Sequence, residues 1–371
     1  MKKSFTFLFL VTLIFAMSLP TNSNAEDLQR KNTSSLYIES DSVATEYTSY
    51  VKEEKNNIFS SLKDVVDERI LNSLYSEDIV YFGNGFTLNE IHYFPVLCHN
   101  KIIAMLAVLQ EEGEYSWTLS TDFVEGLNEI ASKTSVDKPA RIYIEKANVY
   151  ADISGDVYQL TFIPEFQTIG QEKTTQNLSD SSQGVMDIYD VTERITTDVF
   201  EIKSESRTSS SKYLFLDLKE NQEHNSWCSA YAGAQILRYT RRGNIYARDI
   251  LKHYYPYLND SDLKNKSISN DQLIKYANLK KSFPYRRNST LSQDGVKSQI
   301  NNNKPIYLGC AGTGIYDKKR HALVLRGYNT SNNTYSVWNP WSKGYISMSV
   351  SSKSIAVNGG RFIWDNTIQG W

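Results

Sequence analysis

The stretch Asn221-Gln222-Glu223-His224-Asn225-Ser226-Trp227-Cys228-Ser229-Ala230-Tyr231 decides the fold of the second half of the chain. Alanines and aliphatic residues follow Cys228, and Gly233 is the only glycine or proline before Leu237. This pattern predicts a helix that begins at or just before the cysteine. The first N–H groups of a helix have no partner within the helix and lie at the positive end of its dipole. Both effects favour the thiolate, which is the nucleophilic form of cysteine.

A nucleophilic thiol needs a base, and His321 is the best placed of the five histidines. It opens an apolar strand pattern, and a polar turn at 329–333 leads into a second strand pattern that ends at Trp338. This hairpin would bring Asn339 beside the His321 ring. An amide oxygen there would accept one imidazole N–H and leave the other ring nitrogen facing the thiol. Gln222 is the candidate hydrogen-bond donor to an oxyanion that forms beside the sulfur.

The order of these residues resembles that of the papain-like cysteine peptidases. The form Asn-x-Trp-Cys-x-x-Tyr around Cys228, together with Asn-Pro-Trp at Asn339, most resembles the staphopain family of secreted bacterial thiol proteases. The resemblance implies an α+β fold in which a helix carries the cysteine and an antiparallel sheet carries His321 and the asparagine. It also implies catalytic roles for Cys228, His321, Asn339 and Gln222, protein or peptide substrates, and neither a cofactor nor a metal.

Residues 1–25 have the features of a secretory signal. Lys2 and Lys3 precede an apolar run over 5–19, and Ser23-Asn24-Ala25 supplies small residues for cleavage. The alternative is an uncleaved membrane anchor, but this run is shorter than the ~20 residues that a spanning helix needs. We therefore expect a secreted protein without a stable membrane anchor.

The two parts of the remaining chain have opposite charge. Residues 26–211 carry 15 Lys and Arg against 32 Asp and Glu, a net charge of −17, whereas 212–371 carry 23 against 10, a net charge of +13. The difference predicts an acidic prodomain, 26–170, docked on a basic peptidase domain, 212–371. Two independently solvated domains are the alternative. Polar tracts within 171–211 predict a linker that contains the activation cleavage.

The resemblance further implies that the prodomain is an intramolecular inhibitor, and it leaves room for a dedicated protein inhibitor as another partner. We expect no nucleic-acid partner. The prodomain itself reads as α+β. Helical spacing of apolar residues covers 44–75, two strand patterns flank His99-Asn100 as a hairpin, and Asp122 with Glu125 resembles a capping box that opens a helix.

Each assignment has a simpler alternative. Cys228 alone is compatible with an inert buried cysteine, and Trp338 and Trp341 are compatible with packing as much as with shielding an Asn339–His321 bond from water. The three cysteines contain no C-x-x-C pair, which argues against a zinc site. The alternatives for function are amidase or acyl-transfer activity on the same fold, and a catalytically silent protein that binds through its basic domain.

Overall fold

The computed structural model describes residues 35–41, 43–66, 80–99, 101–161, 184–189, 211–223 and 225–371. The proposed signal, 1–25, and most of the expected linker lie outside the described residues. Within the linker range, residues 184–189 are described, and they include a short strand that pairs with the first strand of the chain. The last part of the expected helical segment, 67–75, is also outside the described residues.

In the described parts of the first half, the structure contains the helices and the hairpin that the sequence predicts. Helix α2 (Thr45–Ser60) and α3 (Leu62–Val65) confirm the helical pattern, and β4 (Ile91–Cys98) and β5 (Lys101–Glu111) form the hairpin around His99. The further elements are β2 (Val80–Phe82), β3 (Phe86–Leu88), β6 (Glu114–Ser120), α5 (Val124–Ile130) and η1 (Ala131–Lys133). A second sheet has the order β10-β1-β7-β8-β9, formed by β10 (Gly184–Asp187), β1 (Tyr37–Ser40), β7 (Ala140–Glu145), β8 (Asn148–Ile153) and β9 (Asp156–Gln159).

The expected capping box before α5 is wrong. The N-cap position is Phe123, which has a φ of 66° and makes no side-chain capping bond. The Asp122 carboxylate instead accepts a hydrogen bond of 2.8 Å from the backbone N–H of Asn358, 236 residues further along the chain. A long-range partner thus replaces the local one that the sequence pattern suggested.

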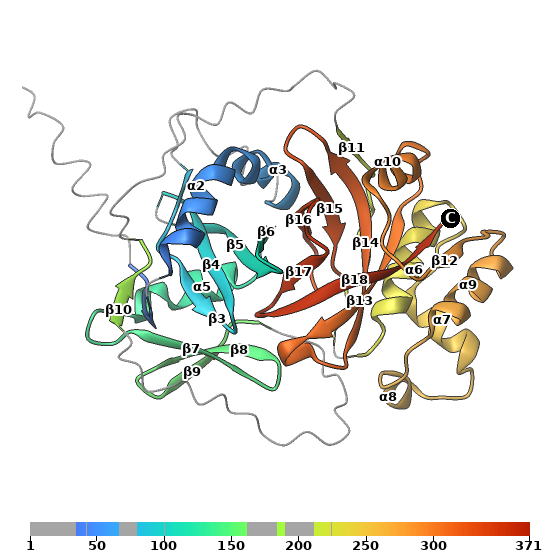
Figure 1. Ribbon diagram of the computed structural model, residues 1–371. Coiled ribbons are helices and arrows are strands. Elements are labelled where there is room, and N and C mark those ends of the chain that lie inside the picture. Colours follow the sequence, from blue (N-terminus) through green and yellow to red (C-terminus); the bar gives the residue numbers. More distant parts are fainter. Residues whose placement is uncertain are drawn as a thin grey trace, which may run out of the picture. The chain divides into compact units, whose positions relative to one another are not determined.

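The second half has helices first and a sheet afterwards, as predicted. The helices are α6 (Cys228–Tyr239), α7 (Ala247–Tyr254), α8 (Asp260–Leu263), α9 (Asn270–Leu279) and α10 (Gln293–Asn301), with the short turn η2 (Gly314–Tyr316). The strands are β11 (Ser211–Tyr213), β12 (Tyr285–Arg287), β13 (Ile306–Thr313), β14 (Arg320–Asn329), β15 (Thr334–Trp338), β16 (Tyr345–Ser349), β17 (Ser354–Val357) and β18 (Gly360–Gln369). Figure 1 shows α6, α7 and α9 gathered on one side of β13, β14 and β18. The fold is therefore α+β with two layers.

Helix α6 is the centre of the helical layer. Every residue from Ala230 to Leu237 is buried, and all of them except Gly233 and Gln235 belong to one apolar cluster with Tyr307 and Trp338 from the sheet. A side chain at Gly233 would come within 2.3 Å of Leu273, so this glycine permits α6 and α9 to pack closely. The small residues of α6 thereby fix the helix, and Cys228 with it, against both its neighbours.

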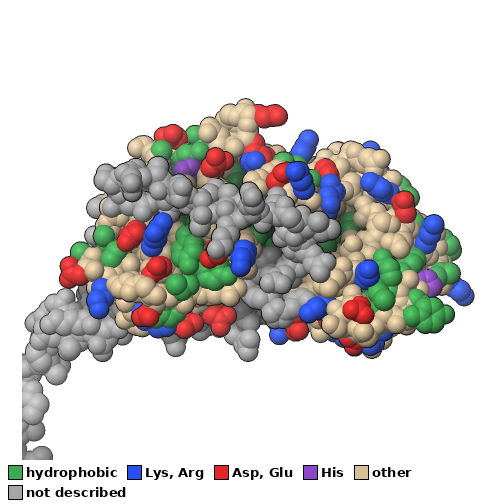
Figure 2. Space-filling view, turned by 90° about the horizontal axis from the view of Figure 1, so that it is seen from below, with side chains coloured by type: hydrophobic (Ala, Val, Ile, Leu, Met, Phe, Trp, Pro, Cys, Tyr) green, Lys and Arg blue, Asp and Glu red, His purple; other side chains and the backbone are tan. Residues whose placement is uncertain are grey.

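The two halves of the chain share one sheet. Strand β6 of the first half pairs antiparallel with β16 of the second half, with Thr118 opposite Met348 and Leu119 opposite Ser347. Nearby, the Asn332 side chain donates hydrogen bonds to the hydroxyls of Ser60 and Ser61, at 3.0 and 2.9 Å. On the face drawn in Figure 2, Asp and Glu side chains are more frequent on the left, and Lys and Arg more frequent on the right. The described parts of the two halves are thus joined by backbone pairing of strands and by side-chain hydrogen bonds.

The hydrogen bond between the Asp122 carboxylate and the Asn358 N–H also joins the two halves, and it should make the stability of the fold depend on pH. Burial raises the pKa of Asp122 to about 6, against the hydrogen bonds from Asn358 and Ser120, which lower it. Because the folded pKa is above the unfolded one, the folded state is favoured at low pH and loses stability as the pH rises through about 6. Between pH 4 and pH 8 the free energy of unfolding should fall by up to about 3 kcal/mol through this group. We expect Asp122→Asn to remove that fall. Urea unfolding at several pH values measures it, with exposed Asp137→Asn as the control. Equal pH profiles for Asp122→Asn and the unaltered chain would contradict the prediction.

Candidate active site

Cys228 is the first residue of α6, as the sequence predicts, and Trp227 is its N-cap. The loop before the helix is held by Trp227, whose backbone N–H donates to Asn225 Oδ1 at 3.1 Å and whose indole N–H donates to the Leu263 carbonyl at 2.9 Å. These bonds fix where the helix begins. The Cys228 sulfur therefore lies among the unpaired N–H groups of the first turn.

His321 and Asn339 meet as predicted. His321 is the second residue of β14, and Asn339 directly follows β15, which pairs with β14 through the predicted hairpin. The His321 Nε2 lies 2.8 Å from Asn339 Oδ1. Because an amide oxygen only accepts, this bond places the ring proton on Nε2 in the neutral imidazole. Asn339 Oδ1 also accepts the backbone N–H of Trp341 at 3.1 Å, so the amide is itself held in place.

Of Trp338 and Trp341, which flank Asn339, only Trp341 covers the His321 ring. The Trp341 ring stacks on the His321 ring with a centroid distance of 4.0 Å, and Phe362 lies on the same ring at 5.0 Å. Trp338 is fully buried, and its indole N–H donates to the Ser342 carbonyl. Trp338 belongs to the core that packs on α6. Of the two tryptophans, Trp341 is therefore the one that lies against the His321 ring.

Gln222 lies next to the Asn339 segment. Its backbone N–H donates to the Pro340 carbonyl at 2.6 Å, and its side-chain amide donates to the Asn225 carbonyl at 2.5 Å. The side chain is buried, with 2% of its surface exposed. Its amide group keeps a second N–H beyond the one that the Asn225 carbonyl accepts.

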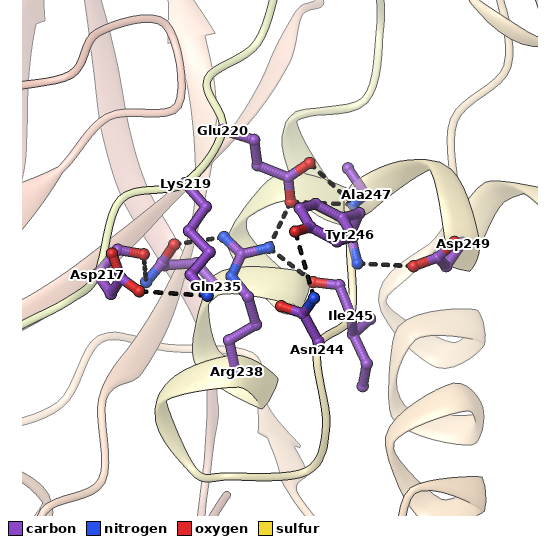
Figure 3. A network of polar contacts seen from close by, with 10 residues as sticks. All are labelled: Asp217, Lys219, Glu220, Gln235, Arg238, Asn244, Ile245, Tyr246, Ala247 and Asp249. Carbon is purple, nitrogen blue, oxygen red and sulfur yellow. Dashed lines mark hydrogen bonds and ion pairs between the residues drawn. The ribbon is translucent and has the colours of Figure 1, made fainter.

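The segment that leads to Gln222 is anchored to the back of α6 by a polar network (Figure 3). Arg238 lies at its centre and contacts the Glu220 carboxylate at 2.6 Å and the Ile245 carbonyl at 2.6 Å. Glu220 in turn accepts the N–H of Ala247 at the start of α7, at 3.0 Å. Arg238 is 6% exposed, so this ion pair is protected from water and holds the segment firmly.

The thiol and the imidazole line the same cavity but are not hydrogen-bonded to each other. The cavity has a volume of about 880 Å³, and both Cys228 and His321 line it. Within the described part of the chain, His321 Nδ1 has no hydrogen-bond partner. Cys228 is 9% exposed and His321 is 2% exposed. This geometry agrees with the expectation that Nδ1 is the ring nitrogen left for the thiol. The Cys228 sulfur and His321 Nδ1 do not form a hydrogen bond with each other.

Burial favours the neutral form of both groups near pH 7, and it opposes the effect of the helix N-terminus, which favours the thiolate. Burial raises the pKa of Cys228 to about 11, although backbone N–H groups of Ala322 and Ser229 lower it. Burial lowers the pKa of His321 to about 4, although the bond to Asn339 raises it. The cost of removing a charge from water thus exceeds the help that the helix N-terminus gives to the thiolate.

The intact chain should consequently react slowly at Cys228. We expect its alkylation by iodoacetamide to accelerate about tenfold per pH unit from pH 7 to pH 10, because the thiolate fraction follows the raised pKa. Peptide mapping separates Cys228 from Cys98 and Cys310, and a Cys228→Ser chain gives the background. A rate that reaches its plateau below pH 8 would show that the thiol is already ionised.

Two further classes of site are absent from the described residues. Across the described ranges, no three His, Cys, Asp or Glu side chains are grouped so that they could hold a metal ion. Helices long and apolar enough to cross a membrane are likewise missing from the part of the chain that the structure describes.

A cysteine at a helix start, opposite a histidine and an asparagine on a sheet, is the arrangement of a papain-like cysteine peptidase. The comparison with family models agrees, since residues 209–371 match the model described as staphopain peptidase C47. Residues 209–371 are therefore similar to the staphopain peptidases that this family model describes. The match begins three positions before residue 212, the boundary expected from charge.

Relatives of known name align with the whole chain. Staphopain A of Staphylococcus aureus is 21% identical over 397 aligned residues, and the alignment covers 100% of both chains. A protein named extracellular cysteine protease, from Staphylococcus epidermidis, is 21% identical over 415 aligned residues, again with 100% of both chains covered. The similarity thus extends to the first half of the chain, beyond the peptidase domain.

A row of polar side chains beside Cys228 has no counterpart among the features that the sequence predicts. Ser229, directly after Cys228, lies 2.7 Å from the Tyr307 hydroxyl, and that hydroxyl donates to Asn270 Oδ1 at 3.0 Å. Asn270 donates to Asn366 Oδ1 at 2.9 Å. These residues come from four different elements or their ends, so no local pattern in the sequence groups them.

Proposed function

We propose that the chain is a secreted cysteine endopeptidase, made as an inactive precursor, that hydrolyses peptide bonds through Cys228, His321 and Asn339. The single observation that carries the proposal is the 2.8 Å bond between His321 Nε2 and Asn339 Oδ1. It orients the ring so that Nδ1 is available to the cavity that Cys228 also lines. A binding protein would have no use for this orientation.

In the proposed reaction, His321 Nδ1 takes the proton of the Cys228 thiol, and the thiolate attacks the carbonyl carbon of the scissile bond. The backbone N–H of Cys228 and the Gln222 amide donate hydrogen bonds to the resulting oxyanion. The His321 imidazolium then protonates the leaving amine, and a thioester remains. Water, deprotonated by His321, hydrolyses the thioester and releases the thiol. Asn339 stays hydrogen-bonded to the ring throughout.

The precursor state is supported by the electrostatics of the intact chain. A neutral thiol with a raised pKa is a poor nucleophile, and the neutral imidazole beside it has little tendency to take a proton while its pKa is lowered. We propose that removal of the acidic first half, 26–211, favours the ionised form of the pair. We place the signal at 1–25 and the activation cleavage near 203–212, before the peptidase domain.

The test is labelling with the epoxysuccinyl inhibitor E-64, which reacts with papain-like thiols, followed by peptide mapping. The full chain is compared before and after limited proteolysis within 171–211. We expect labelling of Cys228 only after cleavage. Equal labelling before and after would refute the precursor role, and a folded, reduced chain that stays unlabelled in both forms would refute the peptidase assignment.

A further inference from the structure

We propose that the row of polar side chains beside Cys228 is a positioning device, which holds this residue and His321 at the separation that proton transfer between them needs. The inference rests on the proposed function, because it concerns how the two groups of that reaction meet. The positioning residues are Tyr307, Asn270, Asn366 and Asp365. They act through the helix and the strand to which the thiol and the imidazole are attached.

One end of the row is at the cysteine. Ser229 follows Cys228 in the first turn of α6, and its hydroxyl lies 2.7 Å from the Tyr307 hydroxyl. Tyr307 is a residue of β13 and is buried in the apolar cluster that contains α6. Its hydroxyl donates at 3.0 Å to Oδ1 of Asn270, the first residue of α9. The first turn of the cysteine helix is therefore tied to the sheet and to a second helix.

The other end of the row is at the histidine. Asn366 accepts a hydrogen bond of 2.9 Å from Asn270 and donates one of 2.8 Å to Asp365 Oδ1. Asp365 accepts hydrogen bonds from both terminal nitrogens of Arg320, at 2.5 and 2.6 Å. Arg320 begins β14 and directly precedes His321. An unbroken path of hydrogen bonds thus leads from the residue after the proposed nucleophile to the residue before the proposed base.

The Asp365 carboxylate fixes the direction of every bond in the row. It can only accept, so Asn366 faces it with the amide nitrogen and presents its oxygen to Asn270. Asn270 then presents its own oxygen to Tyr307, so the Tyr307 hydroxyl donates. Since the Tyr307 proton is used in that bond, the Tyr307 oxygen accepts the proton of Ser229. The row has one consistent arrangement of donors, and each bond polarises the next.

An ionised Asp365 maintains this arrangement. Burial would raise the pKa of Asp365, but the hydrogen bonds from Arg320 and Asn366 hold it below its usual value. An uncharged amide at this position would donate as well as accept, and the direction of the row would no longer be fixed. The charge of Asp365 therefore orders side chains that lie as far along the row as Ser229.

The sulfur already lies close to the part of β14 at which the row ends. Burial raises the pKa of the Cys228 thiol, whereas the backbone N–H of Ala322 and the charge of Arg320 lower it. These two residues flank His321 in the sequence. Proton transfer needs about 2.6–3.2 Å between the heavy atoms, and a displacement of about 1 Å can lower a rate on the order of a hundredfold. A small shift of α6 against β14 therefore decides whether Nδ1 reaches the thiol.

The test compares variants of the full chain after limited proteolysis within 171–211, with both parts kept together, on one fluorogenic peptide. Tyr307→Phe removes the hydroxyl from the row and keeps the ring that packs on α6. We expect kcat to fall about tenfold and KM to stay within about twofold, because a positioning residue acts on the step after binding. Tyr254→Phe is the matched control and should keep the parent kcat. Its hydroxyl also donates one hydrogen bond, to the Gln272 carbonyl, and its ring packs on the same cluster, but it does not line the cavity.

The pH profile of Cys228 alkylation separates positioning from loss of packing. Near pH 6 the reaction of the cleaved parent with iodoacetamide depends on proton transfer to His321, whereas at pH 10 the thiol ionises without it. Tyr307→Phe should react about tenfold more slowly than the parent at pH 6 and within about twofold of it at pH 10. Equal slowing at both pH values would overturn the positioning role.

A second break at the far end of the row tests whether its members act together. Asp365→Ala should also lower kcat about tenfold, and the combination with Tyr307→Phe should be no slower than either single variant, since one break already opens the row. A combined loss of about a hundredfold would show two independent effects and overturn the inference. An unchanged kcat in Tyr307→Phe would overturn it too, and both results would leave the peptidase function intact. A parent chain that cleaves no peptide would overturn both proposals.

Discussion

Replacing Cys228 with alanine should lower the rate of peptide hydrolysis by a factor of about 10⁴ or more. The loss is large because the proposed covalent intermediate cannot form without the sulfur. The change removes one buried atom at the start of α6, so the folded state should lose only about 1 kcal/mol of stability. Initial rates on a protein substrate, measured beside the thermal unfolding midpoint, separate the two effects.

The chain supplies its own controls for this prediction. Cys98 and Cys310 are also buried and free, and Cys310 lies directly opposite His321 on the neighbouring strand. Cys98→Ala and Cys310→Ala should retain most of the activity, since neither side chain is at the start of α6. If Cys228→Ala kept near-normal activity, or if Cys310→Ala removed it, the nucleophile would have been assigned to the wrong residue.

Trp341→Ala should have the second largest effect, on stability and on catalysis together. Loss of a buried indole typically costs about 3–5 kcal/mol in the free energy of unfolding. The same indole stacks on His321 at 4.0 Å and contacts Tyr316 and Phe362 edge-on. Without it, water would reach the His321–Asn339 bond and weaken the orientation of the ring. We expect kcat to fall by about tenfold or more even at temperatures where the variant is fully folded.

Trp341→Phe separates packing from shielding, since a smaller aromatic ring can still cover the imidazole. This variant should recover most of kcat while it remains less stable than the parent. Trp338→Phe is the matched change at a tryptophan that is buried in the core on α6, and it should lower stability with little effect on kcat. A Trp341→Ala enzyme with unchanged kcat would mean that the indole is only a packing residue.

The sequence was sufficient for the parts of the fold and site that depend on local patterns. The start of α6 at Cys228 follows from small, helix-forming residues after a polar loop, and the meeting of His321 with Asn339 follows from two strand patterns and the turn between them. Both are encoded within short stretches, and a hairpin fixes which residues come close.

The remainder depends on contacts between distant segments. Asp122 has the spacing of a helix cap, yet its partner is Asn358, which no local pattern identifies. The neutral state of Cys228 and His321 depends on how much water the whole fold excludes, whereas the sequence shows only the helix that favours a thiolate. The row of polar side chains beside Cys228 joins α6, α9, β13 and β18.

The pairing of β6 with β16 has a consequence for the handling of a cleaved chain. If the proposed cleavage releases the second half from residues 26–211, the backbone groups of β16 that face Thr118 and Leu119 lose their partners. An open strand edge is a template for another chain, so the released second half should be more prone to self-association and precipitation than the intact chain. Solubility during storage would then be a property that the first half of the chain confers, quite apart from any control of activity.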